Sequence, residues 1–275
     1  MLRASTHLHN GESAGMVTSL DLAAAARAAG LTPISAIVRE LDGAGSAAIL
    51  PDLPLYPASM IKTPLAMAVY AEVERGAVGI DDRFEVTEAN MTANDKPSPL
   101  VPGYRATVRE LIELMITISD NVATNMFFDI VGRERATAIA RETFGLGNTA
   151  FHRKLSGSEP LIHDPGWTSG VRNTHPASDA ARAFALIRSG TVPFAGDLLA
   201  TLGRQQFDDK LDAGLRPGDR FFHKTGDTDE VSHDGGILET AEGRTYAIVA
   251  YTGLPSGESS SAKFGPFMAR LREAL

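Results

Sequence analysis

The strongest constraint on the fold is where strand-like and helix-like hydrophobic patterns fall along the chain. Strand-like runs lie near both ends, over 34–41, 47–50, 220–226, 235–239 and 245–252. Helical spacing of apolar residues covers 21–29, 59–75, 107–118, 122–131, 177–188, 194–207 and 261–275. Elements of this kind must bury their apolar faces against one another. The pattern therefore predicts an α+β fold, with an antiparallel sheet of about five strands, flanking terminal helices and an inserted all-helical lobe.

The same pattern predicts how the chain is divided. We expect residues 1–20 to form a disordered leader, and residues 21–55 and 205–275 to form a discontinuous α/β lobe. Residues 56–204 would form the helical lobe, with a ligand cleft between the two lobes. Within it, residues 148–173 carry Gly, Pro and Ser and no period. So long an unpatterned loop inside a compact protein is often functional.

Composition narrows the range of partners. A formal charge of −8 disfavours a nucleic acid or an anionic membrane as the partner. We expect a monomer that acts on a small-molecule substrate. Cysteine is absent and no His-Glu-x-x-His spacing occurs, so neither a metal nor another cofactor is expected. No signal peptide opens the chain. The compartment stays open: cytoplasmic as written, secreted or periplasmic if an upstream signal is missing.

Three short motifs occur in order: Ser-Met-Ile-Lys at 59–62, Ser-Asp-Asn at 119–121 and Lys-Thr-Gly at 224–226. Each alone has an ordinary interpretation, as a helix N-cap with a solvated lysine, a turn and a strand end. Together, at a helix start, in a loop and on a strand, they are rarely coincidental.

The first motif suggests a chemistry. A serine hydroxyl is a poor nucleophile near neutral pH and needs a base within hydrogen-bonding reach. Ser59 and Lys62 lie three residues apart and share a helix face. A lysine acts as a base only if desolvation and a nearby positive charge lower its pKa. Lys224 of the third motif is the candidate for that second cation.

With these motifs, the chain from about residue 21 onward resembles the class A β-lactamases and related serine hydrolases of the penicillin-recognising serine enzyme superfamily. The segments 107–111, 174–176 and 204–206 are also similar to the family. The segment 232–235 is most similar to the less-characterised related branch. The resemblance implies hydrolysis of a β-lactam amide through an acyl-enzyme on Ser59.

The resemblance also assigns roles to residues. The implied catalytic residues are Ser59, Lys62, Ser119 and Glu159, and the implied substrate-binding residues are Asn121, Lys224, Thr225, Gly226, Asp227 and His233. Ser119 would relay a proton, and the backbone N–H groups of Ser59 and Asp227 would stabilise the oxyanion. A carboxylate at 227 departs from the family pattern, and it disfavours an anionic substrate unless it is turned away or paired.

For two of these residues, Glu159 and His233, the sequence leaves a second interpretation open. Glu159 begins a Glu-Pro sequence in the unpatterned loop and matches the family's deacylating glutamate, or it is a solvated loop carboxylate. His233 falls near the position where many family members place an arginine for the substrate carboxylate. Whether it acts in the cleft depends on its surroundings.

Three functions follow. The first is a serine β-lactamase. The second is a D-Ala-D-Ala peptidase or an esterase with the same serine-acyl chemistry. The third is a non-hydrolytic module that binds β-lactams or peptidoglycan fragments, and the complete motifs argue against it because binding alone does not require Lys62.

Overall fold

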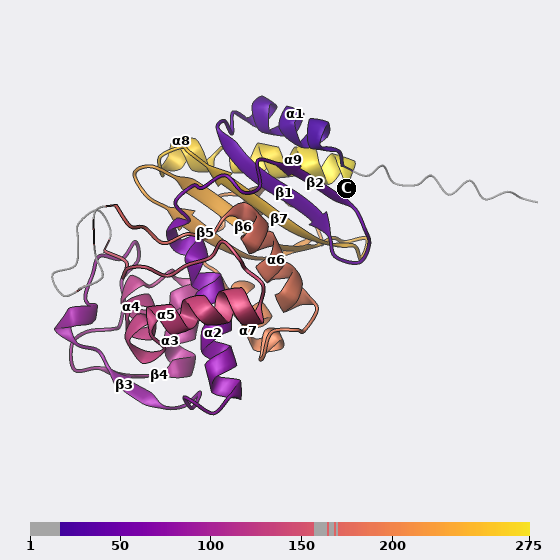
Figure 1. Cartoon of the computed structure of the whole chain (residues 1–275). Coiled ribbons are helices and arrows are strands. Elements are labelled where there is room, and N and C mark those ends of the chain that lie inside the picture. The colour runs from indigo at the N-terminus through magenta and orange to yellow at the C-terminus, as the bar shows by residue number, and fades with distance from the viewer. Residues whose placement is uncertain (1–16, 157–163, 165–167, 169) are drawn as a thin grey trace, which may run out of the picture.

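The computed structural model describes residues 17–156, 164, 168 and 170–275. Its largest sheet has five antiparallel strands in the order β2-β1-β7-β6-β5 (Figure 1). The strands are β1 (Ile34–Glu40), β2 (Ser46–Ile49), β5 (Arg220–Asp227), β6 (Ser232–Glu239) and β7 (Thr245–Thr252). The predicted α+β fold, with one sheet built from both ends of the chain, is confirmed.

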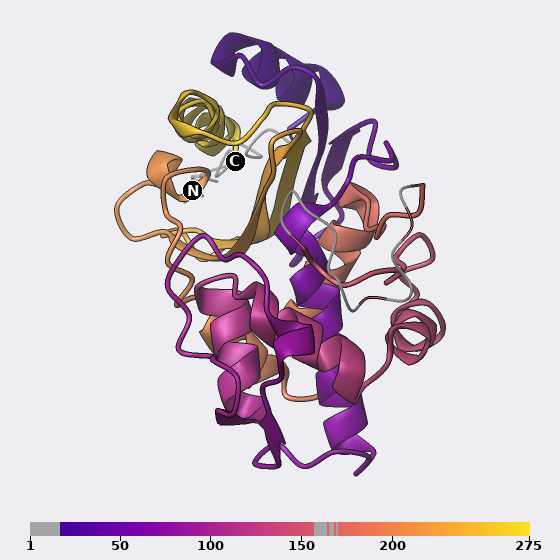
Figure 2. The ribbon, with the colours of Figure 1, turned by 90° about the vertical axis from the view of Figure 1, so that its left-hand side faces the viewer.

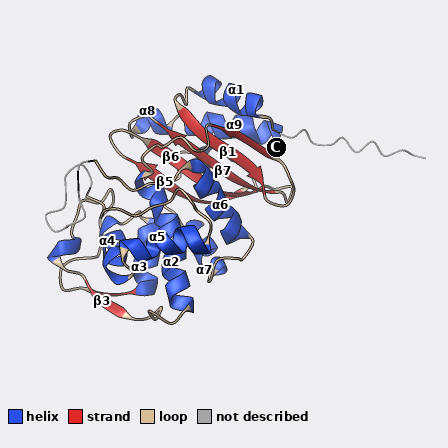
Figure 3. Ribbon diagram, viewed as in Figure 1, coloured by secondary structure: helices blue, strands red, loops and turns tan. Residues whose placement is uncertain are grey.

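Helices occupy the middle of the chain and both of its described ends (Figure 3). The α-helices are α1 (Ser19–Ala29), α2 (Lys62–Glu74), α3 (Val108–Thr117), α4 (Asn121–Ile130), α5 (Arg133–Ala138), α6 (Ala177–Arg188), α7 (Ala195–Leu202), α8 (Glu258–Ser261) and α9 (Phe264–Ala274). The shorter elements are the 3-10 helices η1 (Ala58–Ile61), η2 (Glu88–Asn90) and η4 (Asp212–Gly214), the π-helix η3 (Ile139–Thr143), and the paired strands β3 (Arg83–Glu85) and β4 (Arg105–Thr107).

The central strand β7 shows how the sheet separates two hydrophobic cores. Successive side chains of a strand point to opposite faces of the sheet. Ile248 and Ala250 pack into the core that contains α1 and α9, whereas Ala247 and Val249 pack into the core shared with α2 and α6. Figure 2 shows α1 and α9 on one side of the sheet and α6 on the other. Both faces of the sheet are therefore covered.

Helix α6 belongs to the inserted segment but packs on β1, β6 and β7. The second face of the sheet is thus covered from within residues 56–204. The exact lobe boundaries stay a prediction. No helix within the described ranges is long and apolar enough to cross a bilayer.

Helix α2 is buried on nearly all sides, as its continuous apolar sequence requires. Its third residue is Pro64, a position in the first helical turn where proline costs little. The helix therefore gives residues 59–62, at its start, a rigid support.

The sheet also approaches η1 closely, and glycine allows this. A Cβ atom on Gly226 would lie 3.0 Å from the carbonyl oxygen of Pro57 and 3.1 Å from the backbone nitrogen of Met60. The end of β5 thus packs directly against the residues that flank Ser59, which brings the first and third motifs together.

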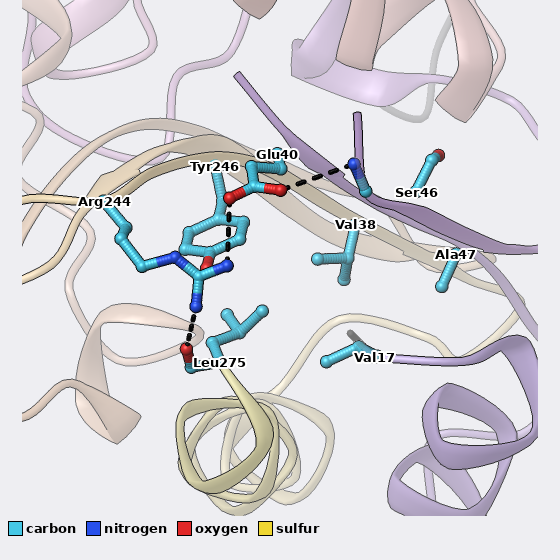
Figure 4. A pocket seen from close by; sticks show the side chains of 9 residues that line it. Val17, Val38, Glu40, Ser46, Ala47, Arg244, Tyr246 and Leu275 are labelled. Carbon is cyan, nitrogen blue, oxygen red and sulfur yellow. Dashed lines mark hydrogen bonds and ion pairs between the residues drawn. The ribbon is translucent and has the colours of Figure 1, made fainter. Parts of the chain in front are cut away.

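A small cavity of about 20 Å³ lies beside β1, β2 and the C-terminal residue (Figure 4). It is lined largely by apolar side chains such as those of Val17 and Val38, and it has room for about one water molecule. At its edge, the guanidinium group of Arg244 donates to the carbonyl oxygen of Leu275 at 2.6 Å and to Glu40 Oε1 at 2.9 Å. The hydrogen bonds of Arg244 at the edge of this cavity therefore link Leu275 to Glu40 of β1.

Some predicted elements differ from the structure. The helix expected over 194–207 spans Ala195–Leu202, and the helix expected over 261–275 begins only at Phe264, after the separate short helix α8. The small β3–β4 sheet and α5 were not predicted. Strands of three residues and a helix of six are too short to show a hydrophobic period.

Candidate active site

Ser59 lines a cavity of about 470 Å³. It is half-buried in η1, at the start of the helical segment that continues into α2. The residue before it, Ala58, has φ +48°, in the left-handed region that alanine rarely adopts. Such strained residues cost about 1–3 kcal/mol and cluster at functional sites. The backbone therefore holds Ser59 in an unusual but defined position at the cavity.

Lys62 is fully buried and lies between the first and second motifs. Its Nζ atom donates to the backbone carbonyl of Ser119 at 2.5 Å, to the hydroxyl of Ser119 at 3.0 Å and to Asn121 Oδ1 at 2.7 Å. These three bonds use every N–H of an ammonium group. Within the described residues, Ser59 is not a hydrogen-bond partner of this ammonium group.

The surroundings lower the pKa of Lys62. Burial lowers its pKa well below 10.5, and the positive charge of Lys224 lowers it further, against the opposing effects of Asp120 and Asp95. Burial also lowers the pKa of Lys224, to about 7. The pair of buried lysines that the sequence suggested is therefore present, with the electrostatic effect that a lysine base requires.

The Ser-Asp-Asn loop is held by its own backbone conformation and by caps. Ser119 has φ +58°, and Asp120 caps α4 by accepting from the backbone N–H of Ala123 at 2.9 Å. The side chain of Asn121 donates to the carbonyl of Ala93 at 2.8 Å while its oxygen accepts from Lys62. The loop therefore presents Ser119 and Asn121 to the lysine in fixed orientations.

Strand β5 reaches the cavity at its last residue, Asp227. Lys224 and Thr225 are buried, and Lys224 Nζ donates to the carbonyl of Thr225 at 3.0 Å. Gly226 packs against η1, and the next residue, Asp227, lines the same cavity as Ser59. The backbone positions expected to supply the two oxyanion donors thus lie on adjoining elements.

The carboxylate of Asp227 is paired. Lys210 Nζ donates to its two oxygens at 2.8 and 2.6 Å, and Ser232 Oγ donates to Oδ1 at 2.9 Å. Lys210 is only 2% exposed. Nothing in the sequence distinguished it, because a lysine after two aspartates is typical of a solvated surface.

His233 is placed differently from what direct substrate contact would require. Its side chain has no exposed surface, Nε2 lies 2.8 Å from the carbonyl of Tyr56, and Nδ1 accepts from the backbone N–H of Thr252 at 3.1 Å. Burial lowers its pKa to about 4, so the ring is neutral near pH 7. The ring stacks on Tyr251 with centroids 4.3 Å apart. The structure therefore does not bring this imidazole to the cavity.

Glu159 lies outside the described residues, and its predicted role stays untested. The segment just before it does reach the cavity, because Lys154, Leu155 and Ser156 line it. Leu155 is fixed by Asn125, whose side chain donates to the carbonyl of Leu155 at 2.9 Å and accepts from its N–H at 2.8 Å.

One further contact, at the rim of the cavity, was not predicted from the sequence. The guanidinium group of Arg172 lies 4.1 Å from the ring centre of Tyr56 and donates to Glu230 Oε2 at 2.6 Å. Arg172 and Tyr56 also line a second cavity of about 500 Å³. The loop end and the β5–β6 turn are thereby joined across the rim.

Comparison with solved structures gives the class. The chain is similar to a β-lactamase from Sphaerobacter thermophilus DSM 20745, with a TM-score of 0.79, 26% identity, and coverage of 94% of this chain and 97% of that chain. It is similar to PBP-A, with a TM-score of 0.80, 26% identity, and coverage of 94% and 97%. The fold is the β-lactamase/transpeptidase-like fold of class A β-lactamase-related serine enzymes.

The chain belongs to the Beta-lactamase enzyme family, whose sequence profile matches residues 19–268. It is 28% identical over 205 residues to β-lactamase L2 of Stenotrophomonas maltophilia, covering 70% of this chain and 64% of that protein. It is 25% identical to the β-lactamase regulatory protein BlaB of Streptomyces cacaoi, covering 79% and 83%. The chain thus spans less than two thirds of the length of the L2 enzyme.

Proposed function

We propose that this protein is a serine β-lactamase that hydrolyses the β-lactam amide through an acyl-enzyme on Ser59. The observation that carries the proposal is the buried amine of Lys62, held between Ser119 and Asn121 beside the cavity that Ser59 lines. The family membership and the β-lactamase relatives support the substrate class.

Deprotonation of Lys62 makes the proposed acylation possible. A neutral amine has two N–H groups and one lone pair, so it no longer holds all three of its present partners. Ser59 lies about one helical turn before Lys62, on the same face of the helical segment. The lone pair then takes the proton of Ser59 Oγ as this oxygen bonds to the substrate carbonyl carbon.

The remaining steps use the other motifs. The developing oxyanion accepts hydrogen bonds from the backbone N–H groups of Ser59 and Asp227. When the carbon–nitrogen bond breaks, the leaving nitrogen takes the Ser119 hydroxyl proton, which Lys62 replaces. In deacylation, Glu159 takes a proton from the attacking water, whose hydroxide bonds to the acyl carbon. The proton returns to Ser59 Oγ and frees the enzyme.

A second candidate is a D-Ala-D-Ala peptidase or an esterase with the same acyl chemistry. Asp227 in the cavity wall favours the esterase, because its pairing with Lys210 keeps that cation from a free carboxylate, which both a β-lactam and a D-Ala-D-Ala peptide carry. A mutant of PBP-A forms an acyl-enzyme with penicillin G, which is the chemistry that both candidates share.

Turnover of nitrocefin tests the first candidate. We expect the wild-type protein to show a burst followed by steady turnover of about 1 s⁻¹ or more, an ordinary rate for an enzyme. Ser59→Ala should abolish both phases, whereas Ser46→Ala, at an exposed position in β2, should leave both unchanged. A stable adduct without turnover excludes a β-lactamase. Hydrolysis of a small ester without nitrocefin turnover selects the second candidate.

A further inference from the structure

Lys210 and Asp227 form an ion pair at the wall of the Ser59 cavity. The three bonds that Lys210 Nζ donates go to the two Asp227 oxygens and to the carbonyl of His233, at 2.8, 2.6 and 3.0 Å. These use all three N–H groups of the ammonium. The cation is thus buried and fully occupied by groups of the protein itself.

Asp227 is a fixed part of the cavity wall. Its side chain is 29% exposed, it lines the cavity together with Ser59, and Ser232 Oγ holds one of its oxygens. It also interacts electrostatically with the cation of Lys224 on the same strand. One carboxylate therefore reduces the net positive charge that the two buried lysines place beside the cavity.

We propose that Asp227 determines specificity by occupying Lys210, so that the site disfavours a carboxylate on the leaving-group side of the scissile bond. Of two substrates with the same scissile bond, the one with an uncharged group there, such as an ester or an amide, should therefore acylate Ser59 faster than the one with a carboxylate. Lys210 is a concealed carboxylate-binding cation that Asp227 keeps from the substrate. This inference rests on the proposed acyl chemistry of Ser59 and assigns the charge of its substrate.

A matched pair of substrates tests the inference: benzylpenicillin and its methyl ester, which differ only in the charge of that carboxylate. The rate constant for acylation of Ser59 is measured for each by intact-mass spectrometry. In Asp227→Ser, the ratio of the carboxylate rate to the ester rate should rise about tenfold or more above the wild-type ratio. An unchanged ratio overturns the inference.

Two further variants separate the causes. Asp229→Ser removes one negative charge from the same cavity rim at an exposed residue, where solvent screens the charge. In Asp229→Ser, the ratio of the carboxylate rate to the ester rate should differ from the wild-type ratio by less than about threefold. The double variant Asp227→Ser with Lys210→Met should show no rise in the ratio of the carboxylate rate to the ester rate, because the cation that Asp227→Ser releases is no longer present. A gain that persists in the double variant overturns the role of Lys210.

Misfolding of a variant and failure of the proposed function give results different from those expected if this inference alone is wrong. If Asp227→Ser does not give a cooperative melting transition, Asp227→Asn removes the charge at nearly constant size, and it should raise the ratio in the same direction. Wild type that acylates Ser59 with neither substrate contradicts the proposed function and this inference together. Acylation by the ester with no change of ratio in either variant contradicts this inference alone.

Discussion

The amine of Lys62 lies 3.0 Å from the hydroxyl of Ser119, and this contact joins the start of α2 to the loop before α4. The two residues are 57 positions apart in the sequence. The protonation state of Lys62 Nζ therefore determines whether it donates to the Ser119 hydroxyl or can accept a proton from the Ser59 hydroxyl.

Acylation should depend on deprotonation of Lys62. Because burial and Lys224 lower its pKa well below 10.5, the acylation rate should fall as the pH drops and Lys62 gains a proton. Lys62→Arg keeps the charge but cannot lose a proton near neutral pH. We expect this variant to lose acylation by about 100-fold or more at every pH. Stopped-flow acylation rates check this, and a variant within about tenfold of wild type would contradict it.

Lys224 should make stability depend on pH. Its folded pKa is about 7, against 10.5 for the free side chain, so between these values the unfolded state binds more protons. The free energy of unfolding should therefore rise with pH across this window, by up to about 1.4 kcal/mol per pH unit from this group. Urea denaturation at several pH values measures the slope. Lys224→Met should remove this contribution, and Lys263→Met, at a partly exposed position, should retain it; equal slopes in both variants would refute the assignment.

Glu159 should act after acylation. Glu159→Gln removes the base that activates water and leaves Ser59 and Lys62 in place, so the nitrocefin burst should persist while steady turnover stalls. Glu258→Gln, on α8, is the matched control and should leave both phases unchanged. An unimpaired steady state in Glu159→Gln would remove this residue from the mechanism.

Asp120 should support both stability and catalysis as the N-cap of α4. Asp120→Ala should cost about 1 kcal/mol of stability, and acylation should slow because Asn121 begins the uncapped helix. Thr18 caps α1 in the same way, and Thr18→Ala should cost a similar amount without slowing acylation. Thermal melts and acylation rates measured together distinguish the two roles. Acylation that is equally fast in both variants would show that the α4 cap does not position the site.

The predictable parts of this protein are those with a period or a motif. Helix α6 and strand β7 have the predicted bounds, because the apolar residues of α6 follow the 3.6-residue period over 12 residues, and β7 is a nearly continuous apolar run of 8 residues, as a strand buried on both faces requires. The first two motifs place Lys62, Ser119 and Asn121 in contact, because the fold brings an early helix and a mid-chain loop together.

What the sequence could not give depends on contacts between distant segments. Lys210 has no local signal of burial, and only its pairing with Asp227 accounts for it. His233 was placed by resemblance, but its ring nitrogens bind the backbone of Tyr56 and Thr252, which a linear pattern does not show. The opposite charges at 210 and 227 are 17 positions apart, too far for a helical or strand period to link them.

The most direct test of the account is to locate the covalent adduct. Wild-type protein is treated with a fluorescent penicillin, digested, and mapped by tandem mass spectrometry. The reaction is quenched in acid before the acyl-enzyme hydrolyses, and we predict a single acyl group on Ser59, absent from Ser59→Ala and present in Ser46→Ala. Labelling of a different residue, or equal labelling of Ser59→Ala, would contradict the assignment of Ser59 as the nucleophile.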